Sequence, residues 1–261
     1  MKNFNFKSAT NTKEASKLAA GRATFLAGGM SLIPAMKLRL AAYSDLINIK
    51  NIKGLSGIKV SSKSIKIGAT TTHAEVAASK EVGKSISSLS ILADGIGDPQ
   101  VRNRGTIGGS IANNDPAADY PSACLALNAT IHTNKRKIPA GKFFKGMFET
   151  DLKKGELIEA VEFEVPEKSA YAKFPNPASR YAVVGVYVAK LTKEVRVAVT
   201  GAGNCVFRST ELESALSSNF SPTSIDSANI SSKGLNSDLH ASAEYRAHII
   251  KVMAKKAVSS C

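Results

Sequence analysis

Hydrophobic and polar residues alternate along several short segments of this chain, which is the pattern of half-buried β-strands. The segments Ile58–Val60 and Ser64–Gly68 alternate in this way and are joined by Ser-Ser-Lys, which predicts a hairpin. Residues 181–191 and Val195–Thr200 are rich in β-branched side chains and predict a second antiparallel pair. Residues 129–165 are also strand-rich. Most of the strands are therefore expected in the middle and last parts of the chain.

Other segments repeat apolar residues every three or four positions, as amphipathic helices do. The pattern predicts helices over residues 12–20, 31–40, 71–78, 87–95 and 241–257. Thr12 and Ser31 are the expected N-caps of the first two, and a proline stands in the first turn of the second. Thr72 is followed three residues later by Glu75, which is the spacing of a capping box.

The predicted C-terminal helix has an apolar stripe formed by Tyr245, Ile249, Val252 and Met253. Lysines follow in its last turns, where positive charge is favoured. The preceding residues 217–232 are rich in serine and asparagine and predict a loop or a short helix. Because helices and strands are intermixed without an internal repeat, the sequence predicts an α+β fold.

Two glycine pairs far apart in the sequence each stand beside a small hydroxyl side chain. The first is Ala-Gly-Gly-Met-Ser at residues 27–31, and the second is Thr-Ile-Gly-Gly-Ser at residues 106–110, followed by Ile-Ala-Asn-Asn-Asp-Pro-Ala-Ala-Asp. Glycine adopts positive φ values and lets backbone N–H groups converge on an anion. The first loop is predicted to open a helix, where free N–H groups favour phosphate. Either pair alone is an ordinary turn, but together they predict a pyrophosphate gripped from two sides.

The charge balance raises the question of nucleic acid. The chain has 35 Lys and Arg against 21 Asp and Glu, a formal net charge of +14. The basic residues are dispersed, and the densest groups, at residues 135–137 and 251–256, are not interleaved with aromatic side chains. A solvated basic face, or a surface for an acidic protein partner, is favoured over a nucleic-acid interface.

The polar chemistry of the chain excludes several classes of site. Cys124, Cys205 and Cys261 are widely spaced and form no Cys-x-x-Cys pair, so neither a zinc site nor an iron–sulfur cluster is expected on this chain. The four histidines show no metal-ligand spacing, and no Ser/His/Asp or paired-carboxylate arrangement is evident. No metal ligand and no catalytic acid or base is therefore predicted.

Turns and apolar runs divide the chain into three predicted blocks, residues 1–52, 53–166 and 167–261. The hydrophobic fraction, 43%, is ordinary for a soluble globular protein. No segment has the length of uncharged apolar sequence that a membrane span needs, and the first residues lack the apolar core of a signal peptide. We expect a cytoplasmic protein without a membrane span.

With these motifs in view, the chain resembles the FAD-binding medium subunit of molybdenum hydroxylases, the family of aerobic carbon monoxide dehydrogenase and xanthine dehydrogenase. The resemblance is carried in order by residues 27–41, 67–76, 94–121, 174–184 and 238–250, which span nearly the whole chain. The pair of glycine motifs, with the Asp-Pro-Ala-Ala-Asp that follows the second, is the most specific part. The resemblance implies an FAD-binding fold of the p-cresol methylhydroxylase and vanillyl-alcohol oxidase type. Two subdomains, residues 1–52 and 53–166, would hold FAD, and a C-terminal carbon monoxide dehydrogenase flavoprotein-like domain, residues 167–261, would cover it.

The resemblance also implies which residues bind the FAD pyrophosphate. From the first motif and the two residues after it these are Ala27, Gly28, Gly29, Met30, Ser31, Leu32 and Ile33. From the second motif they are Thr106, Gly108, Gly109 and Ser110.

Four further positions are implied in the same way. Asp119 is expected to accept a hydrogen bond from a cofactor hydroxyl, with a helix-cap role as the alternative. Ile96 and Leu157, or Ile158 in place of the latter, fall where the family places apolar contacts to the flavin, although core packing is the other interpretation. Lys173 is expected to bring a positive charge near the flavin or its phosphates, unless it is a surface lysine.

The function implied by the resemblance is electron transfer within a heterotrimeric oxidoreductase. A small subunit would carry [2Fe-2S] clusters, a large subunit the molybdenum cofactor, and two heterotrimers would form a dimer. This chain would pass electrons from the clusters through FAD to an external acceptor. The alternative is a stand-alone flavin-dependent oxidase or dehydrogenase of the same fold. The substrate, and whether NAD, a quinone or oxygen is the acceptor, are left open by the sequence.

Overall fold

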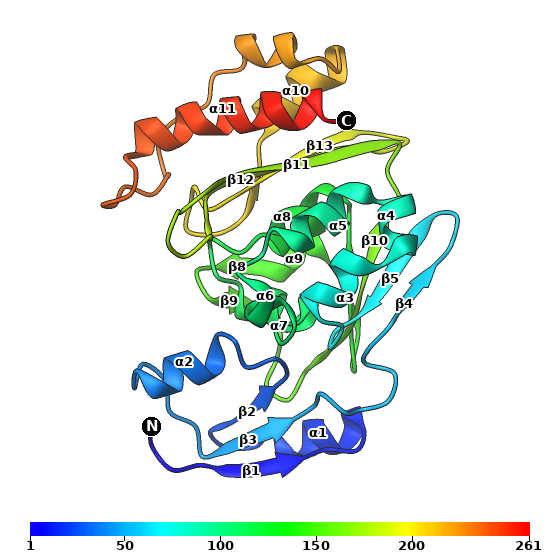
Figure 1. Cartoon of the computed structure of the whole chain (residues 1–261), viewed down its shortest axis with the longest axis vertical. Helices are drawn as coiled ribbons and strands as arrows, with labels where there is room; N and C mark the ends of the chain where they lie inside the picture. The colour runs from blue at the N-terminus through cyan, green and yellow to red at the C-terminus, as the bar shows by residue number, and fades with distance from the viewer.

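Three β-sheets succeed one another along the long axis of the molecule. The computed structural model describes all residues, 1–261. Figure 1 shows the N-terminal sheet at one end, a helix-covered sheet in the middle, and a third sheet under the long C-terminal helix at the other end. The mixture of helices and sheets confirms the predicted α+β class. The three-block division with limits at 52 and 166 stays a prediction.

The N-terminal sheet has three parallel strands in the order β1-β3-β2. Its elements are β1 (Asn5–Ser8), α1 (Thr12–Leu18), β2 (Ala23–Leu26), α2 (Leu32–Lys37) and β3 (Asp45–Asn48). Ala15 of α1 and Ile47 of β3 are fully buried in a small apolar cluster under the sheet. The predicted N-cap Thr12 was wrong by one residue, because the side chain of Asn11 accepts the hydrogen bond from the Glu14 N–H.

The middle sheet is antiparallel, with the strand order β4-β5-β10-β6-β7, and a small two-stranded sheet lies beside it. The strands are β4 (Ile58–Val60), β5 (Ser64–Gly68), β6 (Thr130–Thr133), β7 (Lys137–Pro139), β8 (Phe144–Gly146), β9 (Glu149–Thr150) and β10 (Ile158–Glu164). The helices are α3 (His73–Ala78), α4 (Lys80–Ser85), α5 (Ser87–Asp94), α6 (Pro99–Arg102), α7 (Ile107–Asn113), α8 (Tyr120–Ala126) and α9 (Ala140–Phe143). The predicted β4–β5 hairpin and the Thr72–Glu75 capping box are both confirmed.

The third sheet has four antiparallel strands and is covered on both faces. It comprises β11 (Lys168–Pro175), β12 (Ala182–Lys190), β13 (Val195–Thr200) and β14 (Phe207–Arg208), followed by α10 (Thr210–Ser218), the 3-10 helix η1 (Pro222–Ser227) and α11 (Ala243–Ser259). Val186 and Val188 of β12 pack toward α10 and α11, whereas Tyr187 and Ala189 pack into the middle core. Because successive side chains of a strand point to opposite faces, this central strand is apolar throughout. The sheet therefore joins the C-terminal helices to the helices of the middle block.

The buried face of α11 differs from the predicted one. Ile249 and Met253 are buried as expected, but Tyr245 and Val252 are 44% and 38% exposed. The stripe that packs on the sheet includes Arg246 and Ile250, which recur at helical spacing with Ile249 and Met253. Tyr245 and Val252 therefore lie at the edges of the stripe. A membrane-spanning helix is absent, since none combines the required length with the required hydropathy.

Candidate functional site

The first glycine motif forms the turn between β2 and α2, and its backbone donors are free. The N–H groups of six consecutive residues, 27–32, make no hydrogen bond to any acceptor in the chain. Gly29 has φ +75°, a left-handed conformation that is unfavourable for other residues. A left-handed residue next to helical ones gathers successive N–H groups into a concave, anion-binding arrangement. This turn is therefore built to bind an anion through its main chain.

The side chain of Ser31 does not cap α2. Its backbone is already helical, with φ −102° and ψ −45°, and its hydroxyl accepts no hydrogen bond from the helix. A capping side chain needs an extended backbone at the N-cap, so the predicted cap at Ser31 was wrong. The Ser31 hydroxyl is consequently available to another group.

The second glycine motif is the first turn of a helix and not a free loop. Thr106 is the N-cap of α7, and its hydroxyl accepts the Gly109 N–H at 3.1 Å. The Ile107 and Gly108 N–H groups donate to carbonyl oxygens of the segment before α3, at 3.1 and 2.9 Å, and the Ser110 N–H donates to the Thr106 carbonyl. The backbone donors expected from this motif are thus used inside the chain. What it offers outward is the exposed backbone of Gly109 and the half-buried Ser110 side chain.

The first motif touches the two residues that precede the second motif. A Cβ on Gly28 would lie 2.1 Å from the Arg104 carbonyl oxygen and 2.9 Å from the Gly105 Cα, so no other residue fits there. Gly108 also has no room for a side chain, because a Cβ there would meet the Ala69 Cβ at 2.5 Å. By contrast, a Cβ on Gly109 would meet only the Thr106 hydroxyl, at 2.9 Å. The glycines at 28 and 108 therefore serve close packing, and Gly109 lies toward the open side.

Asp119 is buried and bonded to two side chains of β11. Its carboxylate accepts hydrogen bonds from the Tyr171 hydroxyl and from Lys173 Nζ, the latter 3.2 Å from Oδ2 and 3.1 Å from Oδ1. Burial raises the pKa of Asp119, and the Lys173 charge and the Tyr171 hydrogen bond partly offset this. Asp119 was expected to accept a hydrogen bond from a cofactor hydroxyl, but both of its carboxylate oxygens already have partners within the chain. The alternative interpretation, a side-chain helix cap, is wrong, because Asp119 at the N-cap of α8 has a helical backbone and its side chain makes no cap hydrogen bond.

Lys173 also holds the turn that contains Ile96. Its Nζ donates to the Gly95 carbonyl at 2.8 Å. Arg102 donates to the Ile96 carbonyl at 3.2 Å, and Arg180 donates to the Gly97 carbonyl at 3.0 Å. Three cations thus fix three consecutive carbonyls. Lys173 is neither a free surface lysine nor an unpaired charge, since its side chain is 11% exposed and paired with Asp119.

Ile96 and Leu157 occupy different places. Ile96 is half-buried against the middle core. The Leu157 side chain is 2% exposed and packs in the N-terminal cluster with Ala15 and Ile47, against which Ala27 also packs. Leu157 therefore belongs to the apolar cluster on which Ala27 of the first motif packs, and it presents no free surface. Its neighbour Ile158 is buried in the middle core.

Sequence reasoning missed Tyr181, which reaches the first motif from the turn that precedes β12. The pKa of its phenol is raised by partial burial and by the negative charges of Asp115 and Asp119, and its hydroxyl lies close to the Ser31 side chain. Tyr181 belongs to a segment, residues 174–184, that was matched to the family without a role for this side chain. An aromatic residue at the start of a buried strand carries no local signal that it lies near a loop 150 residues earlier.

His73 lies behind the second motif and is held neutral. Burial, together with the nearby Arg102 charge, lowers the pKa of His73 to about 4. Its ring packs on Tyr120 at a centroid distance of 5.4 Å, and its Nε2 would be 2.5 Å from a Cβ on Gly105. These contacts are those of a packed side chain and not of a catalytic base.

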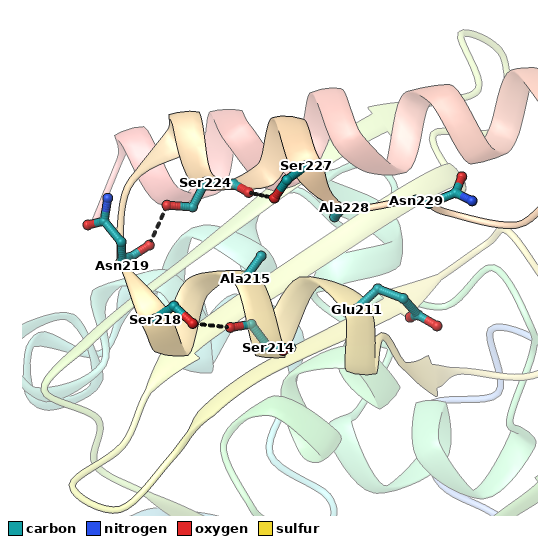
Figure 2. A pocket seen from close by; sticks show the side chains of 9 residues that line it. All are labelled: Glu211, Ser214, Ala215, Ser218, Asn219, Ser224, Ser227, Ala228 and Asn229. Atoms are coloured by element: carbon teal, nitrogen blue, oxygen red, sulfur yellow. Dashed lines mark hydrogen bonds between the residues drawn. The ribbon is translucent and has the colours of Figure 1, made fainter.

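A surface pocket of about 550 Å³ lies elsewhere, between α10 and η1. Figure 2 shows its lining, in which serine hydroxyls point to carbonyls of their own segments. Ser218 donates to the Ser214 carbonyl and Ser224 to the Asn219 carbonyl, at 3.2 and 2.7 Å. These serine hydroxyls are thus hydrogen-bonded within the wall of the pocket. No group of three or more His, Cys, Asp or Glu side chains is placed to hold a metal ion.

The family assignment follows from comparison with known proteins. Residues 2–167 match the family described as the FAD binding domain in molybdopterin dehydrogenase. The glyceraldehyde dehydrogenase medium chain of Sulfolobus acidocaldarius is 35% identical, over 97% of this chain and 96% of that protein. The carbon monoxide dehydrogenase medium chain of Hydrogenophaga pseudoflava is 36% identical over 71% of this chain and 69% of that protein.

A solved structure agrees with this assignment. Reconstituted carbon monoxide dehydrogenase from Oligotropha carboxidovorans superposes with a TM-score of 0.91 at 28% identity, covering 99% of this chain and 97% of that chain. FAD fits the residues present, because the free N–H run at residues 27–32 is the donor set that a pyrophosphate requires. The resemblance stated from the sequence is thereby confirmed. The chain belongs to the family of FAD-binding domains of molybdopterin dehydrogenases and is a flavoprotein subunit of a carbon monoxide dehydrogenase and xanthine dehydrogenase type oxidoreductase.

Proposed function

We propose that this chain is the electron-transfer subunit of a heterotrimeric molybdenum hydroxylase that assembles as a dimer of heterotrimers. A small subunit would carry [2Fe-2S] clusters and a large subunit the molybdenum cofactor. When bound, FAD supplies the redox chemistry that links such clusters to an external acceptor. The observation that carries the proposal is the run of free N–H groups at residues 27–32, in a turn held against Arg104 and Gly105, which lead into the second glycine motif.

In this proposal the main chain of the first motif binds the pyrophosphate. Gly28 brings that turn into contact with the backbone at Arg104, so the two motifs form one surface. Gly109 and Ser110 face the same surface from α7, and Tyr181 closes it near Ser31. Binding through N–H groups needs no lysine or arginine at the phosphates and leaves the nearby cations for other contacts.

The second task of the chain is to orient the apolar turn at residues 95–97. Lys173 on β11 and Arg180 in the turn between β11 and β12 hold its carbonyls, and Asp119 neutralises the buried charge of Lys173. The flavin ring would lie against Ile96, whose position is thus fixed by the C-terminal block. We assign Asp119 to positioning and not to direct contact with a cofactor hydroxyl.

Substrate selection is assigned to the large subunit. The relatives named for glyceraldehyde and for carbon monoxide resemble this chain to a similar degree, although their substrates have little in common. A module shared between such different reactions has no substrate site of its own to conserve. The stand-alone oxidase alternative would instead require a substrate pocket within this chain.

A visible absorption spectrum tests FAD binding. The wild-type chain, given FAD and passed through gel filtration, is expected to keep the flavin bands. Gly109→Asp places a carboxylate on the open side of the second motif, whereas Gly109→Asn has the same bulk without the charge. The Asp variant is expected to bind FAD about tenfold or more weakly than the Asn variant, because the added charge repels the pyrophosphate. A wild type that takes up no FAD, even when produced with its partner subunits, would contradict the proposal.

The heterotrimer is tested by purification through a tag on this chain. Recovery of iron, molybdenum and FAD in one complex is expected. FAD-dependent oxidation of a substrate by the isolated chain, at a rate unchanged by the partner subunits, would support the stand-alone alternative.

A further inference from the structure

We propose that Arg246, in the first part of α11, is a positioning residue for the flavin end of the FAD site. The inference rests on the proposed function, in which the flavin ring lies against the turn at residues 95–97. Arg246 is 3% exposed, and its Nη1 donates to the Val183 carbonyl at 2.6 Å and to the Gly201 carbonyl at 3.0 Å. Its Nη2 donates to the Asp238 carboxylate at 2.7 Å. The guanidinium thus joins the beginning of β12 to the residue that follows β13.

Packing alone does not explain a charge at this position. The neighbouring buried residues of α11 include Ile249, Ile250 and Met253, which pack in one apolar cluster with β12. A buried ion pair is often no more stabilising than well-packed apolar side chains of the same volume. The Arg246 Nε is also buried without a hydrogen-bond partner, which costs free energy. A charge kept in an apolar face at this cost indicates a role in positioning the backbone that it holds.

The first route from Arg246 to the turn at residues 95–97 follows the chain backwards from β12. Val183, whose carbonyl Arg246 holds, comes three residues after Arg180. Arg180 has φ +61°, and its guanidinium donates to the Gly97 carbonyl at 3.0 Å. A left-handed residue other than glycine is strained and persists only where the surrounding structure fixes it. By fixing the start of β12, Arg246 therefore supports the position of Arg180 on the turn.

The second route passes through the residues that precede α8. The Gly201 N–H donates to the Pro116 carbonyl at 2.8 Å, so the residue whose carbonyl the guanidinium of α11 holds is itself bonded to this segment. Asp119 lies three residues after Pro116 and pairs with Lys173. Lys173 Nζ in turn donates to the first carbonyl of the turn at residues 95–97, at 2.8 Å. Both routes therefore end on the same turn.

The pyrophosphate donors lie outside both routes. The N–H groups of residues 27–32 belong to the turn between β2 and α2 and make no hydrogen bond to any residue of either route. Figure 1 shows that turn toward the N-terminal end of the molecule, whereas α11 lies across the third sheet at the other end. Loss of Arg246 should therefore loosen the contact with the flavin ring and leave the pyrophosphate contact in place.

The test compares the dissociation constant of FAD with that of ADP, which contains the pyrophosphate but no flavin. Both are measured on the complex made with the partner subunits and freed of FAD. Arg246→Met is expected to raise the dissociation constant of FAD about tenfold or more, and that of ADP by less than about twofold. A general loss of folded protein raises both apparent constants by the same factor. The ratio of the two constants therefore reports positioning and not stability.

Arg208→Met is the matched control. Arg208 lies on β14 of the same sheet and bonds only to Glu194 and Glu213, outside both routes, so the ratio for this variant should equal that of the wild type. Arg246→Lys is the milder variant if Arg246→Met does not fold. Its ammonium lacks the planar fork of the guanidinium, so the ratio is expected to change in the same direction, by about threefold or more.

Two results would overturn the positioning role while FAD binding stands. One is a wild-type ratio in the folded Arg246 variant, which would leave Arg246 with a structural role alone. The other is an equal change of the ratio in Arg208→Met, because the loss of any paired arginine of the sheet would then have the same effect. A wild-type complex that binds neither FAD nor ADP would instead contradict the proposed function itself.

Discussion

The backbone of Gly28 lies directly against the carbonyl oxygen of Arg104. A Cβ at residue 28 would be 2.1 Å from that oxygen. This contact joins a turn of the N-terminal sheet to the segment that leads into α7, and it brings the two glycine motifs together although they are distant in the sequence.

Gly28→Ala is expected to abolish or strongly weaken FAD binding. The added methyl group cannot be accommodated without moving one motif away from the other, and overpacking of this kind costs about 1–3 kcal/mol. Loss of flavin bands after gel filtration is the measurement.

Gly83→Ala is the control for that variant. Gly83 lies in α4 with no atom within 4 Å of its would-be Cβ, so alanine should preserve FAD binding and stabilise the helix by up to about 1 kcal/mol. Flavin retention by Gly28→Ala at the wild-type level would show that the two motifs need not touch.

The buried pair of Asp119 and Lys173 is expected to be strongly coupled. Asp119→Asn leaves a buried ammonium group unpaired, and Lys173→Met leaves a buried carboxylate unpaired, so each should destabilise the fold by about 3–5 kcal/mol. The double variant should lose less than the sum, with a coupling of about 1–3 kcal/mol in urea unfolding.

The surface pair of Lys190 and Glu167 provides the comparison for this cycle. Its atoms are 3.2 Å apart, but the two side chains are 44% and 47% exposed, so its coupling should be at most about 1 kcal/mol. Equal coupling energies for the two pairs would argue against a positioning role for Asp119.

Glu156 makes the stability of the middle block dependent on acid pH. Although burial raises its pKa, hydrogen bonds from Arg136, the Lys153 N–H and Thr133 outweigh this and lower the pKa to about 2. The ordinary value in an unfolded chain is about 4.3. Because the folded-state pKa is lowered, the stabilisation is fully present above about pH 4.3 and is lost as the pH falls toward 2.

The expected result is a difference in the free energy of unfolding between wild type and Glu156→Gln that is large at pH 7 and shrinks below pH 4. Urea titrations at a series of pH values measure it. Glu244→Gln, at an exposed position, should show a small difference at every pH. A difference for Glu156→Gln that does not change with pH would mean that the carboxylate is not the stabilising form.

Thr200→Val is expected to destabilise the chain by about 1–3 kcal/mol, because it leaves the buried Ala118 carbonyl without a donor. The Thr200 hydroxyl lies 2.6 Å from the Ala118 carbonyl oxygen and 3.0 Å from that of Pro116. Thr200→Ser keeps the hydroxyl and should recover most of the loss. Thermal unfolding of the three proteins is the measurement, and a lower midpoint for Ser than for Val would indicate that the methyl group matters instead.

The sequence predicted the elements whose signals are local. The Thr72–Glu75 capping box, the β4–β5 hairpin and the antiparallel β12–β13 pair each depend on residues close together in the chain, and all three are confirmed. The resemblance to the family was confirmed as well, because the glycine motifs are contiguous and specific.

Relationships between distant residues could not be predicted in this way. The partners of Asp119 are 52 and 54 residues away, and the acceptor of the Gly108 N–H is the Ala69 carbonyl. No local spacing reports that a glycine motif has its donors already occupied, or that a carboxylate is already paired. The two glycine motifs could therefore be located from the sequence, whereas the pairing of their groups within the chain could not be predicted.

The third sheet completes the backbone hydrogen bonding of the segment between α7 and α8. Thr200 and the Gly201 N–H donate to the Pro116 carbonyl, and the Ala182 N–H donates to that of Ala117. The family match ends at residue 167, but these hydrogen bonds connect residues before that limit with residues after it. In evolution, residues 168–261 therefore cannot be exchanged between relatives independently of the segment before α8. Changes in residues 115–119 should be accompanied by changes where β12 begins and β13 ends, and such paired changes should be visible among aligned members of the family.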